Sequence, residues 1–164
     1  MNLSQLKISQ RLLLNLIAAI CLGSVAFAVF SQHVLGMMPC AWCVFQRLIF
    51  ILIALVCLLV NFSNSLLYQK TLATLAVALS VGGMVAAWYQ FSVASVSFSC
   101  DMSFADRFMS RYTGLDGAMP WLFGIYSNCM DAAVTLFGVE YSLWAFILFG
   151  FLAVVLVISL FRKS

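Results

Sequence analysis

The chain has 164 residues, of which 65% are hydrophobic and only 8% are charged, and its formal net charge is +3. So few charged side chains cannot solvate the surface of a soluble domain of this size, so lipid must surround most of the protein. The small, scattered positive charge also excludes an extended nucleic-acid-binding surface.

Two apolar runs in the first part of the chain predict membrane-spanning helices. Residues 12–30 carry no charge, and at about 1.5 Å per residue they can cross a hydrocarbon core about 30 Å thick. Ala26 and Ala28 are spaced as in a signal-peptide cleavage site, but the run stays apolar through Phe30, so we expect it to be retained. Residues 44–62 form the second predicted span, with Arg47 near its start.

Two further spans are predicted in the second part of the chain. Residues 71–91 follow Lys70 and contain Gly82 and Gly83, a pair of small residues that allows a neighbouring helix to approach closely. Residues 143–161 form the last span. Residues 92–142 are too polar to cross a membrane and too long for a simple turn, so they form one long loop.

The expected fold is therefore a single all-α membrane domain, residues 1–164, built as a four-helix bundle with one long extracytoplasmic loop. Five basic residues set the orientation, because they all fall on one side of the predicted spans: Lys7, Arg11, Lys70, Arg162 and Lys163. Residues 31–39, between the first two spans, contain no Lys or Arg. Because basic loops stay in the cytoplasm, both termini are predicted to be cytoplasmic.

An aromatic stretch, residues 119–126, stands out within the long loop. It is too short to cross the membrane. It either lies along the membrane surface, where aromatic side chains favour the headgroup layer, or folds the loop on itself as a small hydrophobic cluster.

The six cysteines fall into two classes by their position. Cys21 and Cys57 lie inside predicted spans, where a thiol acts as a small apolar side chain, and we assign them to packing. The other four lie outside the apolar cores on the predicted outer side: Cys40, Cys43, Cys100 and Cys129. The extracytoplasmic side of a membrane is where disulfides form and persist, so these four are the candidates for redox chemistry.

Cys40 and Cys43 form a Cys-x-x-Cys unit that follows Pro39 at the predicted start of the second helix. The N–H groups and the dipole of a helix start favour a thiolate there. Arg47 lies one turn beyond Cys43, so its cation can stabilise a thiolate or polarise a carbonyl oxygen of an electron acceptor. The alternative for Arg47 is a side chain that reaches the headgroups or pairs with an acid of the loop.

Zinc sites also use Cys-x-x-Cys units, usually in pairs. Here the second unit is absent, because 28 residues separate Cys100 from Cys129. We therefore expect no metal site. Spacing alone leaves all three connectivities of the four outer cysteines open.

This set of motifs resembles the DsbB family, the bacterial disulfide bond formation protein B. The shared features are Gln32-His33-Val34, then Pro39-Cys40-x-x-Cys43 with Arg47, then Cys100-Asp101 and Asn128-Cys129 in the last outer loop. The layout of four spans with a long final outer loop is also similar, so the resemblance extends over nearly the whole chain.

The resemblance implies a multi-pass protein of the inner membrane that reoxidises DsbA, a periplasmic thioredoxin-fold oxidase, and passes the electrons to a membrane quinone, either ubiquinone or menaquinone. It implies that Cys100 and Cys129 form the disulfide that exchanges with the partner. It implies that Cys40 and Cys43 form the pair that reoxidises this disulfide, and that Arg47 lies beside the quinone.

The chain departs from the family pattern at one position. Family members carry a histidine near the outer end of the third helix, at the quinone site, whereas residues 88–91 here contain none. Gln90 is the candidate to supply a hydrogen bond in its place. The single histidine of the chain, His33, is expected to be an interfacial residue at the rim of the first helix.

Two other functions compete with a quinone-linked thiol oxidase. One is an enzyme similar to vitamin K epoxide reductase, but in that family the Cys-x-x-Cys unit follows the loop cysteines, whereas here it precedes them. The other is a non-enzymatic membrane component with structural disulfides, which predicts outer cysteines that never exchange.

Overall fold

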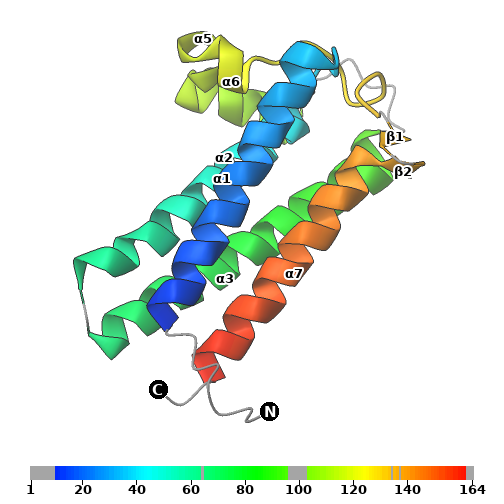
Figure 1. Ribbon diagram of the computed structural model, residues 1–164. Coiled ribbons are helices and arrows are strands. Elements are labelled where there is room, and N and C mark those ends of the chain that lie inside the picture. The colour runs from blue at the N-terminus through cyan, green and yellow to red at the C-terminus, as the bar shows by residue number, and fades with distance from the viewer. Residues whose placement is uncertain (1–9, 64, 96–102, 134, 137, 162–164) are drawn as a thin grey trace.

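The computed structural model describes residues 10–63, 65–95, 103–133, 135–136 and 138–161. Four long helices run side by side, and the short elements of the long loop between the last two of them gather at one end of the bundle, which we call the loop end (Figure 1). The long helices are α1 (Gln10–Val34), α2 (Ala41–Leu58), α3 (Leu66–Tyr89) and α7 (Tyr141–Phe161). A short 3-10 helix, η2 (Leu59–Phe62), extends α2, and a π-helical segment, η3 (Gln90–Ala94), extends α3.

All four helices are long and apolar enough to cross a membrane, which confirms the predicted all-α membrane bundle. The helices are longer than the predicted spans at most of their ends; for example, α1 begins at Gln10 and ends at Val34 rather than covering residues 12–30. The predicted limits marked only the apolar core. A helix continues into the headgroup layer because its backbone hydrogen bonds remain satisfied there.

Helix α1 packs on α2, α2 on α3, and α3 most extensively on α7. The close approach of α3 and α7 depends on Gly83, because a Cβ atom added there would lie 2.5 Å from a ring carbon of Phe149. The ring of Phe149 stacks in turn on Phe50 of α2, with the centroids 4.0 Å apart. The neighbouring Gly82 faces open space, so only one residue of the predicted small pair makes the close contact.

The long loop forms compact structure at the loop end. It contains α4 (Phe104–Asp106), the π-helical segment η4 (Arg107–Thr113), α5 (Leu115–Ala118), α6 (Pro120–Phe123) and a hairpin of β1 (Thr135–Leu136) and β2 (Val139–Glu140). Figure 1 shows α5 and α6 beside the ends of α1 and α2, and the hairpin at the start of α7.

The aromatic stretch at 119–126 partly folds the loop onto the bundle. Phe123 is buried in a small cluster with Val44 of α2 and Met109 of η4. Trp121 and Tyr126 are more than half exposed. One of its aromatic side chains therefore anchors the loop to α2, while these two remain available to the surroundings.

Candidate active site at the loop end of the bundle

Cys40 and Cys43 stand at the start of α2. Cys40 is the N-cap residue, one position before the first helical residue, and Cys43 lies in the first turn. Their sulfur atoms are 3.2 Å apart, within reach of a hydrogen bond between the two thiols. Cys40 is fully buried and Cys43 is partly buried.

Cys129 lies against this pair although it is far away in the sequence. The main-chain N–H of Tyr126 donates a hydrogen bond of 3.1 Å to the carbonyl oxygen of Pro39, which ties the loop to the residue before Cys40. Asn128 and Asp131 bond to each other and form the turn that holds Cys129. The Cys129 side chain is thereby brought into hydrogen-bonding contact with Cys40.

The hydrogen bond with Cys129, then the hydrogen bond with Cys43 and burial, raise the pKa of the Cys40 thiol well above its ordinary value of 9.0. The raised pKa favours the protonated form of Cys40, which is the form that can donate the hydrogen bond it shares with Cys43. The structure thus brings together three of the four outer cysteines. The fourth, Cys100, lies outside the described residues.

Arg47 is buried, with 6% of its surface exposed. Its guanidinium donates hydrogen bonds to Gln32 Oε1 at 2.6 Å and to the carbonyl oxygen of Leu122 at 2.9 Å. A third bond, of 3.2 Å, goes to the carbonyl oxygen of Ala28. The side chain neither reaches the headgroups nor pairs with an acid within the described part of the chain; it joins α1, α2 and α6 beside the cysteines.

Two glutamine side chains, those of Gln46 and Gln90, lie next to Cys43. Gln46 Nε2 donates to Gln90 Oε1 at 2.7 Å, and Gln90 Nε2 donates to Cys43 Sγ at 3.1 Å. Gln46 and Gln90 are 5% and 3% exposed. Gln90, the candidate for a hydrogen bond at this end of the third helix, thus donates to the Cys43 sulfur and does not line the cavity described next.

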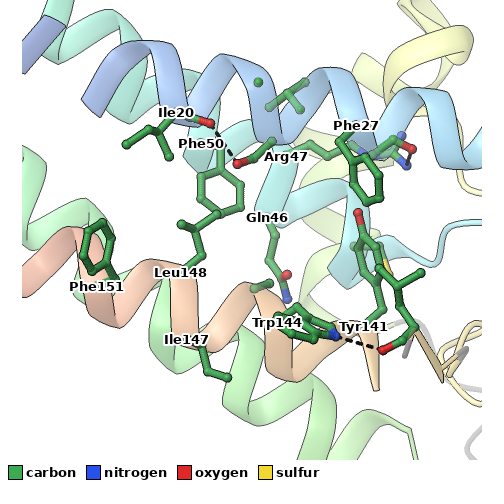
Figure 2. A pocket seen from close by; sticks show the side chains of 17 residues that line it. Ile20, Phe27, Gln46, Arg47, Phe50, Tyr141, Trp144, Ile147, Leu148 and Phe151 are labelled. Atoms are coloured by element: carbon green, nitrogen blue, oxygen red, sulfur yellow. Dashed lines mark hydrogen bonds between the residues drawn. The ribbon is translucent and has the colours of Figure 1, made fainter. Parts of the chain in front are cut away.

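A cavity of about 640 Å³ opens beside Cys43, Gln46 and Arg47. Its walls are mostly apolar and come from α1, α2 and α7, and Figure 2 shows Gln46, Arg47, Tyr141 and Trp144 among the side chains around it. The other lining residues are Ile20, Gly23, Ser24, Val25, Phe27, Ala28, Phe50, Leu136, Ala145, Ile147, Leu148 and Phe151.

The mouth of the cavity faces the lipid side of the bundle. Five of its lining residues are among the exposed large apolar side chains of the helices: Ile20, Phe27, Trp144, Ile147 and Phe151. Trp144 is held by a hydrogen bond of 3.1 Å from its Nε1 to the carbonyl oxygen of Leu136 (Figure 2). An apolar molecule dissolved in the bilayer can therefore reach Cys43 and Arg47 without crossing water.

The remaining polar candidates lie away from the cavity. His33 is exposed, and its Nε2 lies 2.9 Å from the carbonyl oxygen of Trp121, so it sits at the rim of α1. Cys21 and Cys57 are fully buried inside α1 and α2, as expected of packing residues. Within the described ranges, no group of three or more His, Cys, Asp and Glu side chains is arranged to hold a metal ion.

Two site residues were missed in the sequence. Gln46 had a usable signal, because a glutamine next to Arg47 in an apolar helix is costly unless it has a buried partner. Tyr141 had none, because an aromatic residue at the end of a span is ordinary. Only the packing of α7 shows that Tyr141 lines the cavity together with Arg47.

Comparison with known proteins agrees with this geometry. The family described as "Disulfide bond formation protein DsbB" matches residues 10–159. A disulfide bond formation protein B from Herminiimonas arsenicoxydans is 29% identical over 156 residues, which cover 95% of this chain and 98% of that protein.

A second protein of that name, from Paracidovorax citrulli, is 31% identical over 156 residues, covering 93% of this chain and 87% of the relative. A third, from Polaromonas naphthalenivorans, is 31% identical over 166 residues, covering 93% of this chain and 94% of the relative. With four spanning helices and this match along nearly the whole chain, the protein belongs to the DsbB family of membrane disulfide bond formation proteins.

Proposed function

We propose that this disulfide oxidoreductase reoxidises a periplasmic dithiol oxidase of the DsbA type and passes the electrons to a membrane quinone. The observation that carries the proposal is a continuous line of groups from loop to lipid: Cys129 contacts Cys40, Cys40 lies 3.2 Å from Cys43, and Cys43 lines the lipid-facing cavity beside Arg47. A soluble partner can reach one end of this line, and a lipid-soluble acceptor can reach the other.

On the partner side, the chemistry is thiol-disulfide exchange. A partner thiolate attacks the Cys100–Cys129 disulfide, and the second partner thiol resolves the mixed disulfide, so that the partner is oxidised and both loop cysteines are reduced. The contact between Cys129 and Cys40 supports the next exchange. Cys129 attacks Cys40 and releases Cys43 as a thiolate; Cys100 then attacks Cys129 and releases Cys40, which leaves Cys40 and Cys43 reduced.

On the lipid side, the lining of the cavity fits a quinone. The volume of about 640 Å³ lies within the usual range for small-molecule sites, and the walls are apolar, as a ring with a lipid tail requires. A bound quinone would take up the two electrons and two protons that Cys40 and Cys43 lose when their disulfide re-forms, and would leave as a quinol.

Arg47 is the residue that we expect to hold an oxygen atom of the acceptor. Three hydrogen bonds occupy three of the five N–H groups of its guanidinium, which leaves donors for a ligand among the described contacts. Its cation also stabilises a thiolate at Cys43. The hydroxyl group of Tyr141, which lines the same cavity, is a second candidate for polar contact with the acceptor.

We infer that the protein lies in the bacterial inner membrane with both termini in the cytoplasm. The starts of α1 and α3 and the end of α7 share the end of the bundle opposite the loop end (Figure 1). Arg11 and Lys70 belong to that end, and basic residues near span ends favour the cytoplasm. The loop end, with the cysteines, then faces the periplasm, where disulfides persist.

The test is anaerobic mixing of the purified protein with a reduced DsbA-type partner and a soluble ubiquinone or menaquinone analogue, while quinone absorbance is followed. We expect the wild type to consume quinone, and Cys43→Ser and Cys100→Ser each to abolish the consumption. Cys21→Ser is the matched control, because Cys21 is buried in α1 away from the cavity, and it should keep the activity.

A wild type that leaves every quinone untouched, while its outer cysteines stay oxidised beside reduced partner, would instead support a membrane component with structural disulfides. Quinone consumption that persists in Cys43→Ser would contradict the assignment of Cys43 as the group that meets the acceptor.

A further inference from the structure

Gln46 and Gln90, next to Cys43, form a hydrogen-bonded pair in which Gln46 is the donor. Both side chains are buried, and they come from different helices: Gln46 from α2 and Gln90 from the π-helical extension of α3. A hydrogen bond of 2.7 Å joins Gln46 Nε2 to Gln90 Oε1, and a bond of 3.1 Å joins Gln90 Nε2 to Cys43 Sγ. Buried amides in an apolar bundle are costly, so such a pair calls for a reason.

The direction of the hydrogen bond between Gln46 and Gln90 determines which end of the Gln90 amide faces the Cys43 sulfur. An amide group has a donor end and an acceptor end. Because Gln46 donates to the carbonyl oxygen of Gln90, the NH₂ group of Gln90 must point the other way, toward the sulfur. In the reversed orientation the carbonyl oxygen of Gln90 would face the sulfur, which favours a neutral thiol and repels a thiolate.

Cys43 is accordingly surrounded by groups that favour its charged form. The Cys40 sulfur lies 3.2 Å from the Cys43 sulfur at the helix start, and its raised pKa favours the protonated form that can donate to Cys43. Gln90 donates from α3, and the Arg47 cation lies on the same helix one turn further on. A donor amide needs no proton uptake, unlike a histidine, so this contact is available at every pH at which the protein is folded.

We propose that Gln46 is a positioning residue: it fixes the amide of Gln90 so that its NH₂ group holds Cys43 as the thiolate that meets the electron acceptor. This inference rests on the proposed function for the role of that thiolate.

The experiment measures the Cys43 thiolate directly, in reduced protein in detergent at neutral pH, without quinone or partner. One readout is the rate at which iodoacetamide modifies Cys43, followed by mass spectrometry. The other is thiolate absorbance near 240 nm, taken as the difference from Cys43→Ser. The absorbance does not depend on access of a reagent to the cavity.

We expect Gln90→Met to lower the alkylation rate about tenfold and Gln46→Met to lower it several-fold, since a thiolate with fewer donors is less populated. Because Gln46 acts through Gln90, the double variant should be no slower than Gln90→Met alone. Gln69→Met is the control: Gln69 is a buried glutamine near the start of α3, about 30 Å along the helix from Gln90, and it should leave both readouts unchanged.

Gln46→Glu keeps the shape of the side chain but changes its hydrogen bonding and its charge. A carboxylate only accepts hydrogen bonds, so it turns the NH₂ group of Gln90 toward itself and the carbonyl oxygen toward Cys43, and its negative charge also repels a thiolate. For both reasons we expect this variant to have a lower thiolate absorbance than Gln46→Met. It also keeps the proposal testable if Gln46→Met fails to fold, which thermal unfolding in detergent would show.

Thiolate signals within twofold of the wild type in both Gln46 variants would overturn the proposal. So would a loss in Gln46→Met that adds fully to the loss in Gln90→Met, because a residue that acts through Gln90 cannot do so. Neither readout involves quinone turnover, so the result is independent of whether the oxidase reaction itself occurs.

Discussion

The cysteines at the loop end that the structure describes differ in their surroundings. Cys43 lines the cavity and faces donors that favour a thiolate, whereas Cys40 is fully buried between Cys129 and Cys43, and its raised pKa favours the protonated form. This difference suits a sequence in which Cys43 reacts at the cavity and Cys40 exchanges with the loop. It arises from neighbours that come from different parts of the chain.

Cys129→Ala tests the cause of the raised pKa of Cys40. The hydrogen bond with Cys129 is the largest cause, so its loss should move the pKa of Cys40 down toward the ordinary value of a thiol. In reduced protein, the pH profile for alkylation of Cys40, followed by mass spectrometry, should then shift to lower pH. A Cys129→Ser variant keeps a hydroxyl group that can hydrogen-bond, and should shift less.

If the pH profile for alkylation of Cys40 does not shift in Cys129→Ala, burial and the contact with Cys43 alone raise the pKa of Cys40. Equal shifts in the alanine and serine variants would show that contact with sulfur, rather than hydrogen bonding, is responsible.

At the scale of helices, the α3–α7 interface gives α3 its place in the bundle, and α3 in turn carries Gln90 to Cys43. The interface is closed by Gly83 against Phe149, and Phe149 cannot retreat because it is fully buried and stacked on Phe50. A backbone position without a side chain therefore controls the spacing of helices whose loop ends form the site.

Gly83→Ala should destabilise the protein. The added methyl group meets the Phe149 ring at 2.5 Å in a packed core, and overpacking of this kind costs about 1–3 kcal/mol. Thermal unfolding in detergent should show a lower midpoint than for the wild type. Gly82→Ala is the matched control, because Gly82 faces open space, and it should be neutral or slightly stabilising. Equal midpoints for the two variants would contradict the close contact.

At the scale of the whole molecule, the bundle separates two environments. One end carries the ordered loop with the cysteines, and the other end carries the starts of α1 and α3 and the end of α7 (Figure 1). The cysteines and the cavity beside Cys43 lie together at the loop end, as the proposed transfer from a water-soluble partner to a lipid-soluble acceptor requires. This arrangement depends on the orientation of the protein in the membrane.

We predict that both termini face the cytoplasm. A reporter that is active only in the periplasm, fused after residue 161, should be inactive, and the same reporter inserted at the exposed Gly117 of the short helix α5 should be active. Expression of both fusions is checked by immunoblot. The opposite pattern would place the cysteines in the reducing cytoplasm and contradict the proposed partner.

Composition and residue order alone were enough to predict four spans, a long loop and the cysteine pair at a helix start. Those features depend on apolar length and on local geometry, which neighbouring residues along the chain determine. The spans were predicted too short, because hydropathy marks the hydrocarbon core rather than the last hydrogen-bonded turn of a helix.

The contacts that make the site were decided only by tertiary structure. Cys129 meets Cys40 because a main-chain hydrogen bond ties Tyr126 to Pro39. Gln46 meets Gln90, and Tyr141 joins Arg47 at one cavity, because α3 packs on α2 and α7 packs on α3. Such pairs link residues dozens of positions apart, and no local periodicity records them, since they depend on how complete helices pack.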